Sequence, residues 1–241
     1  MFNESRVLIT GGAGFLGSHA VDFLLSRGAN VTCLDNLCTG RLDLVQQHSK
    51  NSRYSFKKID LLNDENLLAS AFEAKDFIFH FAANADVRGG VRNTRIDLEQ
   101  NTIATYNVLE AMRKNDVKNI CFTSSAAVYG DALVIPTPED YAPIQNSLYG
   151  ASKLACEAMI QAYSNYYGMH NWIYRFCPII GERCSHGVVV DFVAKLRKNT
   201  REIEILGDGN QVKSFLYASD YINGIFTGLE KAKENTNIFN L

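Results

Sequence analysis

The stretch Thr10-Gly-Gly-Ala-Gly-Phe-Leu-Gly17 decides how this chain is expected to fold. It ends a β-branched run at residues 6–10, which predicts a buried strand, and it precedes a segment at residues 17–27 whose apolar residues recur at helical spacing. Three of its glycines have the GxxGxxG spacing, which permits a tight turn and lets the backbone approach a pyrophosphate at the start of the helix. A glycine-rich turn without a ligand is the alternative, but the strand–helix context favours a dinucleotide site. We expect the dinucleotide to contact Gly11, Gly14, Phe15, Leu16 and Gly17.

Short runs rich in β-branched and aromatic residues alternate with helical patterns along most of the chain. This alternation is typical of βαβ units, and it predicts an α/β fold with a doubly wound parallel sheet of the Rossmann type. The pattern loosens after residue 176, so we expect a dinucleotide-binding domain at 1–176 and a smaller substrate-binding region at 177–241. After the first strand and helix, the expected strands are 30–34, 54–59, 76–81, 119–123, 172–176 and 214–217, and the expected helices are 64–72, 95–114, 148–167, 189–198 and 220–231.

The composition excludes several classes of protein. The chain has 241 residues, of which 46% are hydrophobic and 21% charged, as is ordinary for a globular protein with a sizeable core. Its net charge of −2 provides no basic field for nucleic acid, and no apolar run approaches the roughly 20 residues of a membrane span. The six cysteines are scattered without CxxC pairs, which argues against a metal site and a disulfide framework. We expect a cytoplasmic protein with reduced thiols that binds neither nucleic acid nor membranes.

Two carboxylates follow the expected second and third strands. Asp35 lies about twenty residues beyond the glycines, where a carboxylate accepts hydrogen bonds from the adenosine ribose hydroxyls and repels a 2′-phosphate. This position favours NAD over NADP, with a solvated loop aspartate as the alternative. Asp60 has the corresponding place after the third strand, where it either meets the adenine or simply ends the strand.

A tyrosine and a lysine four residues apart provide the candidate chemistry. Tyr149 and Lys153 are neighbours on one face of an expected helix, and the ammonium, together with an oxidised nicotinamide, is expected to lower the pKa of the phenol. The tyrosine then becomes a general acid and base. The fifth strand ends in Thr123-Ser124-Ser125, where a hydroxyl can bridge the tyrosine and a substrate oxygen. Taken alone, a tyrosine and a lysine at this spacing are more often a surface pair. The strand-end serines and the glycine motif favour the catalytic interpretation here.

These motifs, in this order, resemble the extended short-chain dehydrogenase/reductases, and among them the nucleotide-sugar epimerases of the UDP-glucose 4-epimerase type. The resemblance spans nearly the whole chain, and the stretches that carry it are 10–17, 35–37, 60–61, 80–83, 124–130, 149–153 and 207–209. It implies that Tyr149, Lys153 and Ser125 are catalytic, Ser125 being preferred to Ser124 because it lies five residues before Gly130. It further implies NAD contacts at Asn36, Leu61, Phe81, Ala82, Ala83, Asn101, Tyr149 and Lys153, and substrate contacts at Ser125, Arg88 and Lys213.

The resemblance also implies an activity and an assembly. In such an epimerase Tyr149 takes the proton from a sugar hydroxyl, here O4, while the hydride passes to NAD, and the keto-sugar turns before the hydride returns to its other face. NAD then stays bound and needs no external redox partner. Helices 95–114 and 148–167 would pair in the interface of a homodimer, with core packing as the competing explanation of their small and apolar residues. A keto-sugar reductase or dehydrogenase that exchanges NAD(P)H and a non-catalytic dinucleotide-binding regulator are the alternative functions.

The sequence departs from the family pattern at several points. Sugar 4,6-dehydratases carry an Asp-Glu pair after the catalytic threonine, and related decarboxylases tend to keep the glutamate, whereas this chain has Ala126-Ala127. Pro178 stands where epimerases usually have an asparagine that touches the substrate phosphate, and Lys213 stands where an arginine often clamps the diphosphate. Enzymes of this family usually continue for several tens of residues beyond this length. We therefore expect a complete dinucleotide half and a truncated substrate-binding region.

Overall fold

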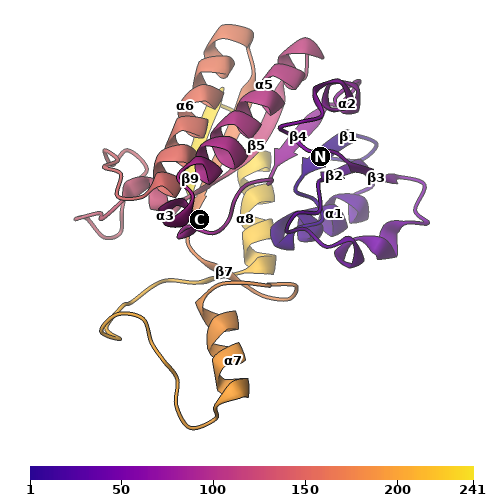
Figure 1. Ribbon diagram of the computed structural model, residues 1–241. Coiled ribbons are helices and arrows are strands. Elements are labelled where there is room, and N and C mark those ends of the chain that lie inside the picture. The colour runs from indigo at the N-terminus through magenta and orange to yellow at the C-terminus, as the bar shows by residue number, and fades with distance from the viewer.

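The protein, described over residues 1–241 by a computed structural model, is built around one seven-stranded sheet (Figure 1). The strand order is β3-β2-β1-β4-β5-β6-β9, and every neighbouring pair is parallel. The chain thus starts in the middle, winds outward to β3 and then crosses to the other side, as in a doubly wound Rossmann sheet. The predicted fold class is confirmed. The strands are β1 Arg6–Thr10, β2 Asn30–Asp35, β3 Tyr54–Lys58, β4 Phe77–His80, β5 Asn119–Ser125, β6 His170–Phe176 and β9 Thr236–Asn240.

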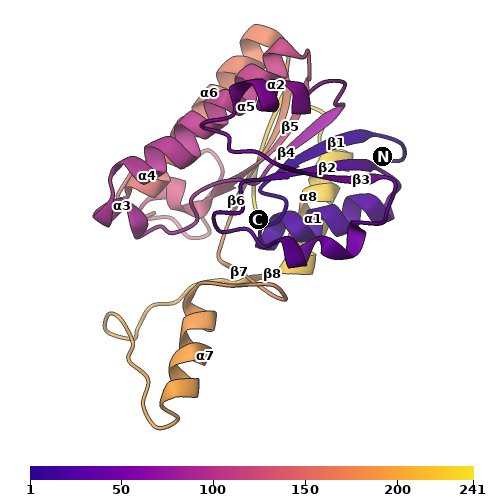
Figure 2. The same ribbon diagram turned by 45° about the vertical axis from the view of Figure 1, so that its right-hand side comes forward.

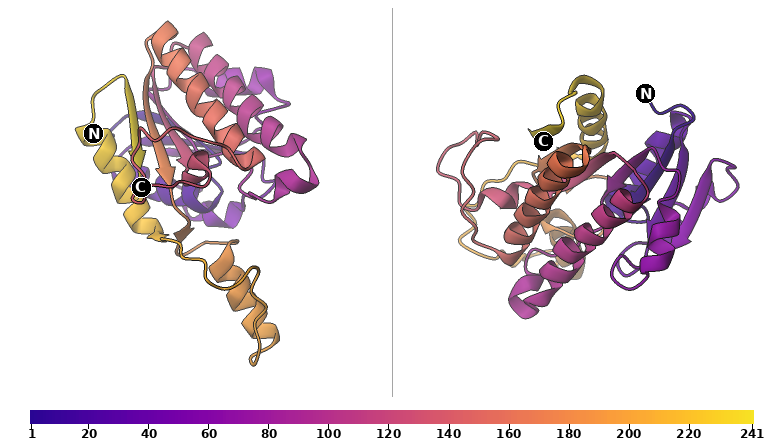
Figure 3. Two further views of the ribbon diagram at one scale, coloured as in Figure 1. Left: turned by 90° about the vertical axis from the view of Figure 1, so that its left-hand side faces the viewer. Right: turned by 90° about the horizontal axis from the view of Figure 1, so that it is seen from above.

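Helices cover both faces of the sheet, which explains why its central strands β1 and β4 are buried on both faces, whereas the edge strand β3 is largely exposed. Helices α1 (Phe15–Ser26) and α8 (Ala218–Lys231) pack on one face (Figure 1). Helices α2 (Glu65–Ala71), α5 (Ala104–Lys114) and α6 (Leu148–Tyr167) pack on the other (Figure 3). In β1, Val7 and Ile9 lie in the core beneath α1 and α8, whereas Leu8 lies in the core of the opposite face.

The predicted helix at 95–114 is interrupted. It consists of α4 (Arg95–Asp97), a π-helical turn (Leu98–Ile103) and α5. Wider π-turns inside helices frequently accompany functional sites, and this one carries the buried Asn101. Strand β5 runs two residues beyond its predicted end, so Ser125 lies at the end of the strand. The remaining short elements are 3₁₀ helices at Leu42–Leu44, Gln46–His48 and Ala126–Tyr129, and α3 (Gly89–Arg92).

The segment 177–217 leaves the sheet. Strands β7 (Ile179–Ile180) and β8 (Leu216–Tyr217) form a separate parallel pair, and α7 (Val188–Lys198) projects away from the sheet (Figure 2). The strand predicted at 214–217 is thus reduced to two residues. Helix α8 and strand β9 return to the main layers, where β9 pairs with β6. The assignment of 177–241 to substrate binding stays a prediction. None of the helices is both long and apolar enough to span a membrane.

Candidate active site

The carboxyl ends of the strands lie along one edge of the sheet, and most of the predicted site residues gather there. Thr10 ends β1, Asp35 ends β2, His80 ends β4 and Ser125 ends β5. Ligands of doubly wound sheets bind in the crevice outside this edge. His80 itself is buried with both ring nitrogens in hydrogen bonds, and burial lowers its pKa to about 3, so it is a neutral structural group.

The glycine-rich turn brings α1 against β1 with no room for side chains. Gly11 has a φ of +68°, and a Cβ there would lie 2.6 Å from the backbone nitrogen of Ala82. A Cβ at Gly17 would strike the carbonyl oxygen of Gly11 and lie 2.8 Å from the Cα of Gly12. Gly14 is the N-cap of α1, where it provides no side-chain cap, and no acidic residue lies in the first turn. The N-terminus of α1 is therefore open to an anion.

Asp35 is held by this turn. Its Oδ2 accepts a hydrogen bond from the N–H of Ala13 (3.0 Å) and its Oδ1 one from the N–H of Leu37 (2.8 Å). The residue is only 7% exposed, and burial raises its pKa, while both N–H groups oppose that shift. The solvated-loop alternative for Asp35 is therefore wrong. The buried carboxylate has lone pairs left for the hydroxyls of a ribose.

The residues predicted for the adenine side meet at the end of β3. The Nδ2 of Asn36 donates to Oδ2 of Asp60 (3.1 Å), and the N–H of Leu62 donates to its Oδ1 (2.8 Å). Leu61 is buried in the hydrophobic core that also contains residues of α5. The two polar side chains therefore fix each other beside the Asp35 loop.

The loop after β4, which carries Phe81 to Ala83, is tied to the π-turn. The Oδ1 of Asn101 accepts a hydrogen bond from the N–H of Asn84 (2.8 Å), and its Nδ2 donates to the hydroxyl of Ser152 on α6 (2.8 Å). Asp97, which the sequence did not single out, accepts from the Nδ2 of Asn84 (2.8 Å). Asp97 is 1% exposed and its Oδ2 has no hydrogen-bond partner. These contacts join the predicted NAD-lining loop to α6, which carries the tyrosine and lysine.

Helix α6 presents Tyr149 and Lys153 from its first two turns. Its N-cap is Ser147, whose Oγ accepts a hydrogen bond from the N–H of Gly150 (3.0 Å). Lys153 is 2% exposed, and its ammonium donates to the carbonyl oxygen of Thr123 (2.9 Å). Because Thr123 lies in β5 two residues before the strand ends, the lysine is anchored beside the predicted catalytic serine.

Ser125 lies close enough to Tyr149 to act on its phenol, so the structure brings together the three residues predicted for catalysis. Burial raises the pKa of Tyr149 to about 12, and the Ser125 side chain opposes the shift. Burial also lowers the pKa of Lys153 to about 8. The predicted lowering of the phenol pKa required an oxidised nicotinamide as well as the lysine, and without the nicotinamide the desolvation of the phenol dominates. A further positive charge beside the phenol is needed.

Ser124 faces a different part of the molecule. Its hydroxyl donates to Glu157, which is fully buried and forms an ion pair with Arg175 at 2.7 Å. Arg175 also donates to the hydroxyl of Tyr129 (2.8 Å). Sequence reasoning missed Glu157 and Arg175. The position of Glu157, four residues after Lys153 on the buried side of α6, was the available signal.

The residues predicted for the substrate lie further out. Arg88 is exposed directly before α3, and α3 packs on the start of α6, where a Cβ at Gly90 would lie 3.2 Å from the Cβ of Leu148. Lys213 is exposed between α7 and β8, and its side chain makes no hydrogen bond. Pro178 is exposed between β6 and β7, where its carbonyl oxygen accepts from the N–H of Leu216 (3.0 Å). The structure thus brings Arg88 near the catalytic helix and leaves Lys213 on the outlying segment.

Comparisons with known proteins identify this arrangement. Residues 7–241 match the NAD dependent epimerase/dehydratase family. The chain belongs to that family. A UDP-galactose 4-epimerase of known crystal structure is 37% identical with a TM-score of 0.87, and the match covers 98% of this chain and 76% of that one. A UDP-glucose 4-epimerase of Thermus thermophilus, solved with NAD, is 32% identical with a TM-score of 0.85, covering 98% and 76%. UDP-glucuronic acid decarboxylase 4 of Arabidopsis thaliana is 34% identical over 98% of this chain and 53% of that protein.

NAD is the cofactor of this family enzyme, as the glycine motif and Asp35 predicted. The structure fits such a group at two independent places. The first is the uncapped N-terminus of α1, which follows a glycine turn. Cβ atoms added to the glycines would clash with backbone atoms, so the turn leaves the close backbone approach that a pyrophosphate requires. The buried carboxylate at the end of β2 suits an unphosphorylated ribose.

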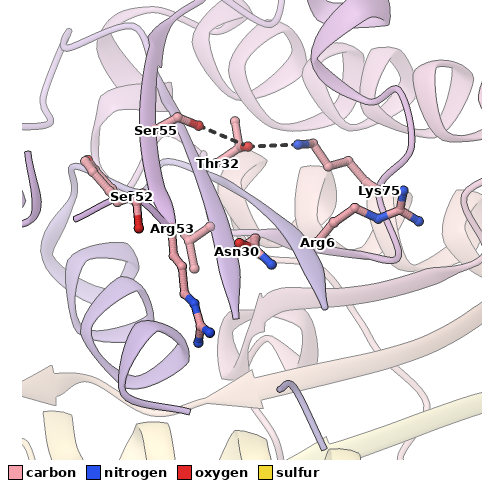
Figure 4. Close-up of a pocket in the computed structure, with 9 residues that line it drawn as sticks. Arg6, Asn30, Thr32, Ser52, Arg53, Ser55 and Lys75 are labelled. Atoms are coloured by element: carbon pink, nitrogen blue, oxygen red, sulfur yellow. Dashed lines mark hydrogen bonds between the residues drawn. The ribbon is translucent and has the colours of Figure 1, made fainter. Parts of the chain in front are cut away.

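A different pocket, of about 150 Å³, lies at the amino ends of β1, β2 and β3 (Figure 4). Lys75 donates there to the hydroxyl of Thr32 (2.8 Å), and Arg6 and Arg53 form ion pairs with Asp76 and Glu4. None of the predicted site residues lines this pocket, because they all belong to the opposite edge of the sheet or to the segment beyond it.

Proposed function

We propose that this enzyme inverts a nucleotide-activated sugar at C4, by transient oxidation to a keto-sugar and return of the hydride to the opposite face. The family establishes an NAD-dependent epimerase or dehydratase acting on nucleotide sugars. Epimerase relatives and the Tyr149, Lys153 and Ser125 cluster support the finer statement.

The observation that carries the proposal is the pair Ala126 and Ala127, which follows Ser125 directly, where elimination of water or loss of carbon dioxide calls for acidic groups. Glu157 is held by Arg175 and Ser124. Asp97, whose Oδ2 has no hydrogen-bond partner, comes from α4 and not from the strand end that carries Ser125. Oxidation and reduction at one carbon need only a single acid/base, and Tyr149 supplies it.

Each catalytic side chain has a role that follows from its contacts. Tyr149, as phenolate, takes the proton of the sugar hydroxyl and later returns it. Ser125 donates a hydrogen bond to the same sugar oxygen and to the phenolate in turn. Lys153, fixed by the carbonyl of Thr123, holds positive charge beside the phenolate. NAD, which the glycine turn before α1 and Asp35 would hold, would supply the hydride chemistry and, when oxidised, a positive charge beside the buried phenol.

We assign the residues that bind NAD and the sugar nucleotide from their places along the sheet edge. Gly11, Gly14, Phe15, Leu16 and Gly17 bind the pyrophosphate of NAD, Asp35 the ribose, and Asn36, Asp60 and Leu61 the adenine side. Phe81, Ala82, Ala83 and Asn101 line the nicotinamide side, and Arg88 and Lys213 meet the diphosphate of the sugar nucleotide.

A substrate panel tests this function. The NAD-loaded enzyme is incubated with UDP-, GDP-, CDP- and dTDP-hexoses, and the epimers are resolved by NMR. We expect inversion at C4 of one class, with no loss of water or carbon dioxide, and a loss of about 10³-fold in kcat for Tyr149→Phe. The Tyr141→Phe variant is the matched control, because Tyr141 is a loop tyrosine outside the site. A dehydrated or decarboxylated product would contradict the proposal.

A keto-sugar reductase is the second candidate, because the same three catalytic residues serve it equally well. It is distinguished by the cofactor. An epimerase regenerates NAD on the protein, whereas a reductase consumes NAD(P)H from solution in proportion to product.

We also propose a homodimer through α5, α6 and the turns that precede them. Tyr106 and Ile103 lie one turn apart and are 46% and 38% exposed, and Tyr166 is 78% exposed. Light scattering after size exclusion should give twice the chain mass, and Tyr106→Glu should give the monomer.

A further inference from the structure

One face of α1 is engaged by the segment that leaves the sheet. Phe15, His19 and Asp22 are spaced i, i+4 and i+7, so they lie in one stripe along the helix. Phe15 belongs to the glycine motif, and the ring of His19 packs edge-on against it with centroids 5.7 Å apart. At 1.5 Å per residue, Asp22 is roughly 10 Å from the end of the helix that receives the pyrophosphate.

The loop after β7 contacts this stripe at two successive residues. The Nε2 of His19 donates to the carbonyl oxygen of Glu182 (3.0 Å), and Arg183 donates from Nη2 to Oδ2 of Asp22 (2.5 Å). The Arg183 and Asp22 side chains are 24% and 34% exposed, so the ion pair is partly shielded from water. The carboxylate of Glu182 in turn accepts from the hydroxyl of Tyr217 in β8 (2.8 Å). We call the four residues His19, Asp22, Glu182 and Arg183 the latch.

The latch holds a segment that is otherwise attached to the main body through the β7–β8 pair, where Ile179 and Leu216 pack against the core. Helix α7 follows it and has no buried residue. Arg183 adopts a φ of +70°, in the left-handed region that non-glycine residues rarely occupy, so its conformation is imposed by its surroundings. Its Nη1 is buried without a hydrogen-bond partner. The ion pair with Asp22 thus holds the Arg183 side chain in place despite the unfavourable backbone conformation and the unpaired Nη1.

We propose that the latch retains NAD by holding the loop after β7 against the second turn of α1, so that release of the dinucleotide requires the Asp22–Arg183 pair to open. The inference deepens the proposed function, on which it rests, because an epimerase must keep the reduced cofactor in place until the hydride returns. Arg183 and Asp22 are then positioning residues that act on cofactor residence and do not touch the reacting atoms.

Release of NAD from the loaded enzyme measures this directly. Radiolabelled NAD is bound, unlabelled NAD is added in excess, and retained label is followed by rapid gel filtration, with no sugar present. We expect Arg183→Gln and Asp22→Asn each to release NAD about five- to tenfold faster. The double variant should be no faster than either single one, because both remove the same ion pair. Arg183→Lys should restore most of the retention.

Two controls separate the latch from general loosening. Lys198→Gln removes a cation from α7 that makes no side-chain hydrogen bond, and His48→Gln removes another partner of Asp22 while leaving Arg183 in place. Both should release NAD at the native rate. Equal release from Arg183→Gln and Lys198→Gln, or additive effects in the double variant, would overturn the proposal. Because no sugar is present, this result is independent of whether the enzyme epimerises any substrate.

A second readout follows turnover. With the substrate found by the panel, the Arg183→Gln enzyme should lose activity progressively unless NAD is added, since some reduced cofactor escapes with each cycle. A merely structural role would lower the thermal midpoint without making activity depend on added NAD.

Discussion

Helices α5 and α7 have the same length of 11 residues and opposite surroundings. In α5, six residues are buried against the sheet and its neighbouring helices, among them Val108. In α7 none is buried, and Val193 is 46% exposed although the helix is similarly amphipathic in sequence. The difference shows that an apolar stripe identifies a helix, whereas the sheet decides whether that stripe is covered.

This contrast extends to the two regions that contain these helices. The sheet-bearing part fixes the residues predicted for catalysis and dinucleotide binding by buried contacts from several strands and helices. The segment 177–217 is held by the short β7–β8 pair, whose Ile179 and Leu216 pack against the core, and by the latch. We therefore expect matched substitutions to change NAD affinity and the free energy of unfolding strongly in the sheet-bearing part and weakly in the segment 177–217.

The largest contrast is expected between two glycines. Gly17→Ala places a Cβ against the backbone of Gly11 and Gly12, so the helix must move away from the turn that receives the pyrophosphate. We expect NAD affinity to fall at least about 100-fold, near 3 kcal/mol, by isothermal titration calorimetry.

Gly209→Ala is the matched control, because its Cβ would meet nothing within 4 Å. Its φ of +80° makes alanine unfavourable by about 1 kcal/mol locally, but NAD affinity should not change. A comparable loss of affinity in both variants would contradict the division of the molecule into these two regions.

The residues of the dinucleotide edge were predictable because local pattern and tertiary role agree. The run at 6–10 is apolar since both faces of β1 are covered, and the glycines are required by close backbone approach rather than by distant partners. The placement of Tyr149 and Lys153 on one face of α6 followed from their spacing.

Other features depend on residues distant in sequence. The π-turn at Leu98–Ile103 was missed because its apolar pattern continues through the helix, and the Glu157–Arg175 pair joins α6 to β6. Asp22 and Arg183 are 161 residues apart, and no local pattern links them. The lack of cover over α7 could not be predicted, since amphipathicity reports only a potential for burial.

An intermediate effect is expected from the buried ammonium of Lys153. Its pKa is about 8 in the folded enzyme and 10.5 ordinarily, so between these values the unfolded chain binds more protons than the folded one. The free energy of unfolding therefore rises with pH across this window. Lys153→Met, whose side chain carries no titrating proton, is the reference. Between pH 7.5 and 9.5 the free energy of unfolding of the NAD-free native enzyme should rise by about 2 kcal/mol relative to that variant.

Urea unfolding at these two pH values measures the difference, and the comparison cancels contributions of other groups. Tyr149, whose raised pKa of about 12 acts in the opposite direction, is present in both proteins, so its contribution cancels in the comparison. A pH-independent difference between the two proteins would show that Lys153 is not desolvated.

The smallest effect compares the two helices directly. Val108→Ala in α5 removes two methyl groups from a residue that is 0% exposed, so unfolding should become easier by about 1.5 kcal/mol. Val193→Ala in α7 removes the same atoms from a largely exposed position, and we expect a change below about 0.5 kcal/mol. Urea unfolding of both variants at one pH makes the measurement. Equal losses of stability would mean that the α7 face is covered in solution. Whether a second copy of the chain covers it can be tested by repeating the Val193→Ala measurement at protein concentrations that differ tenfold.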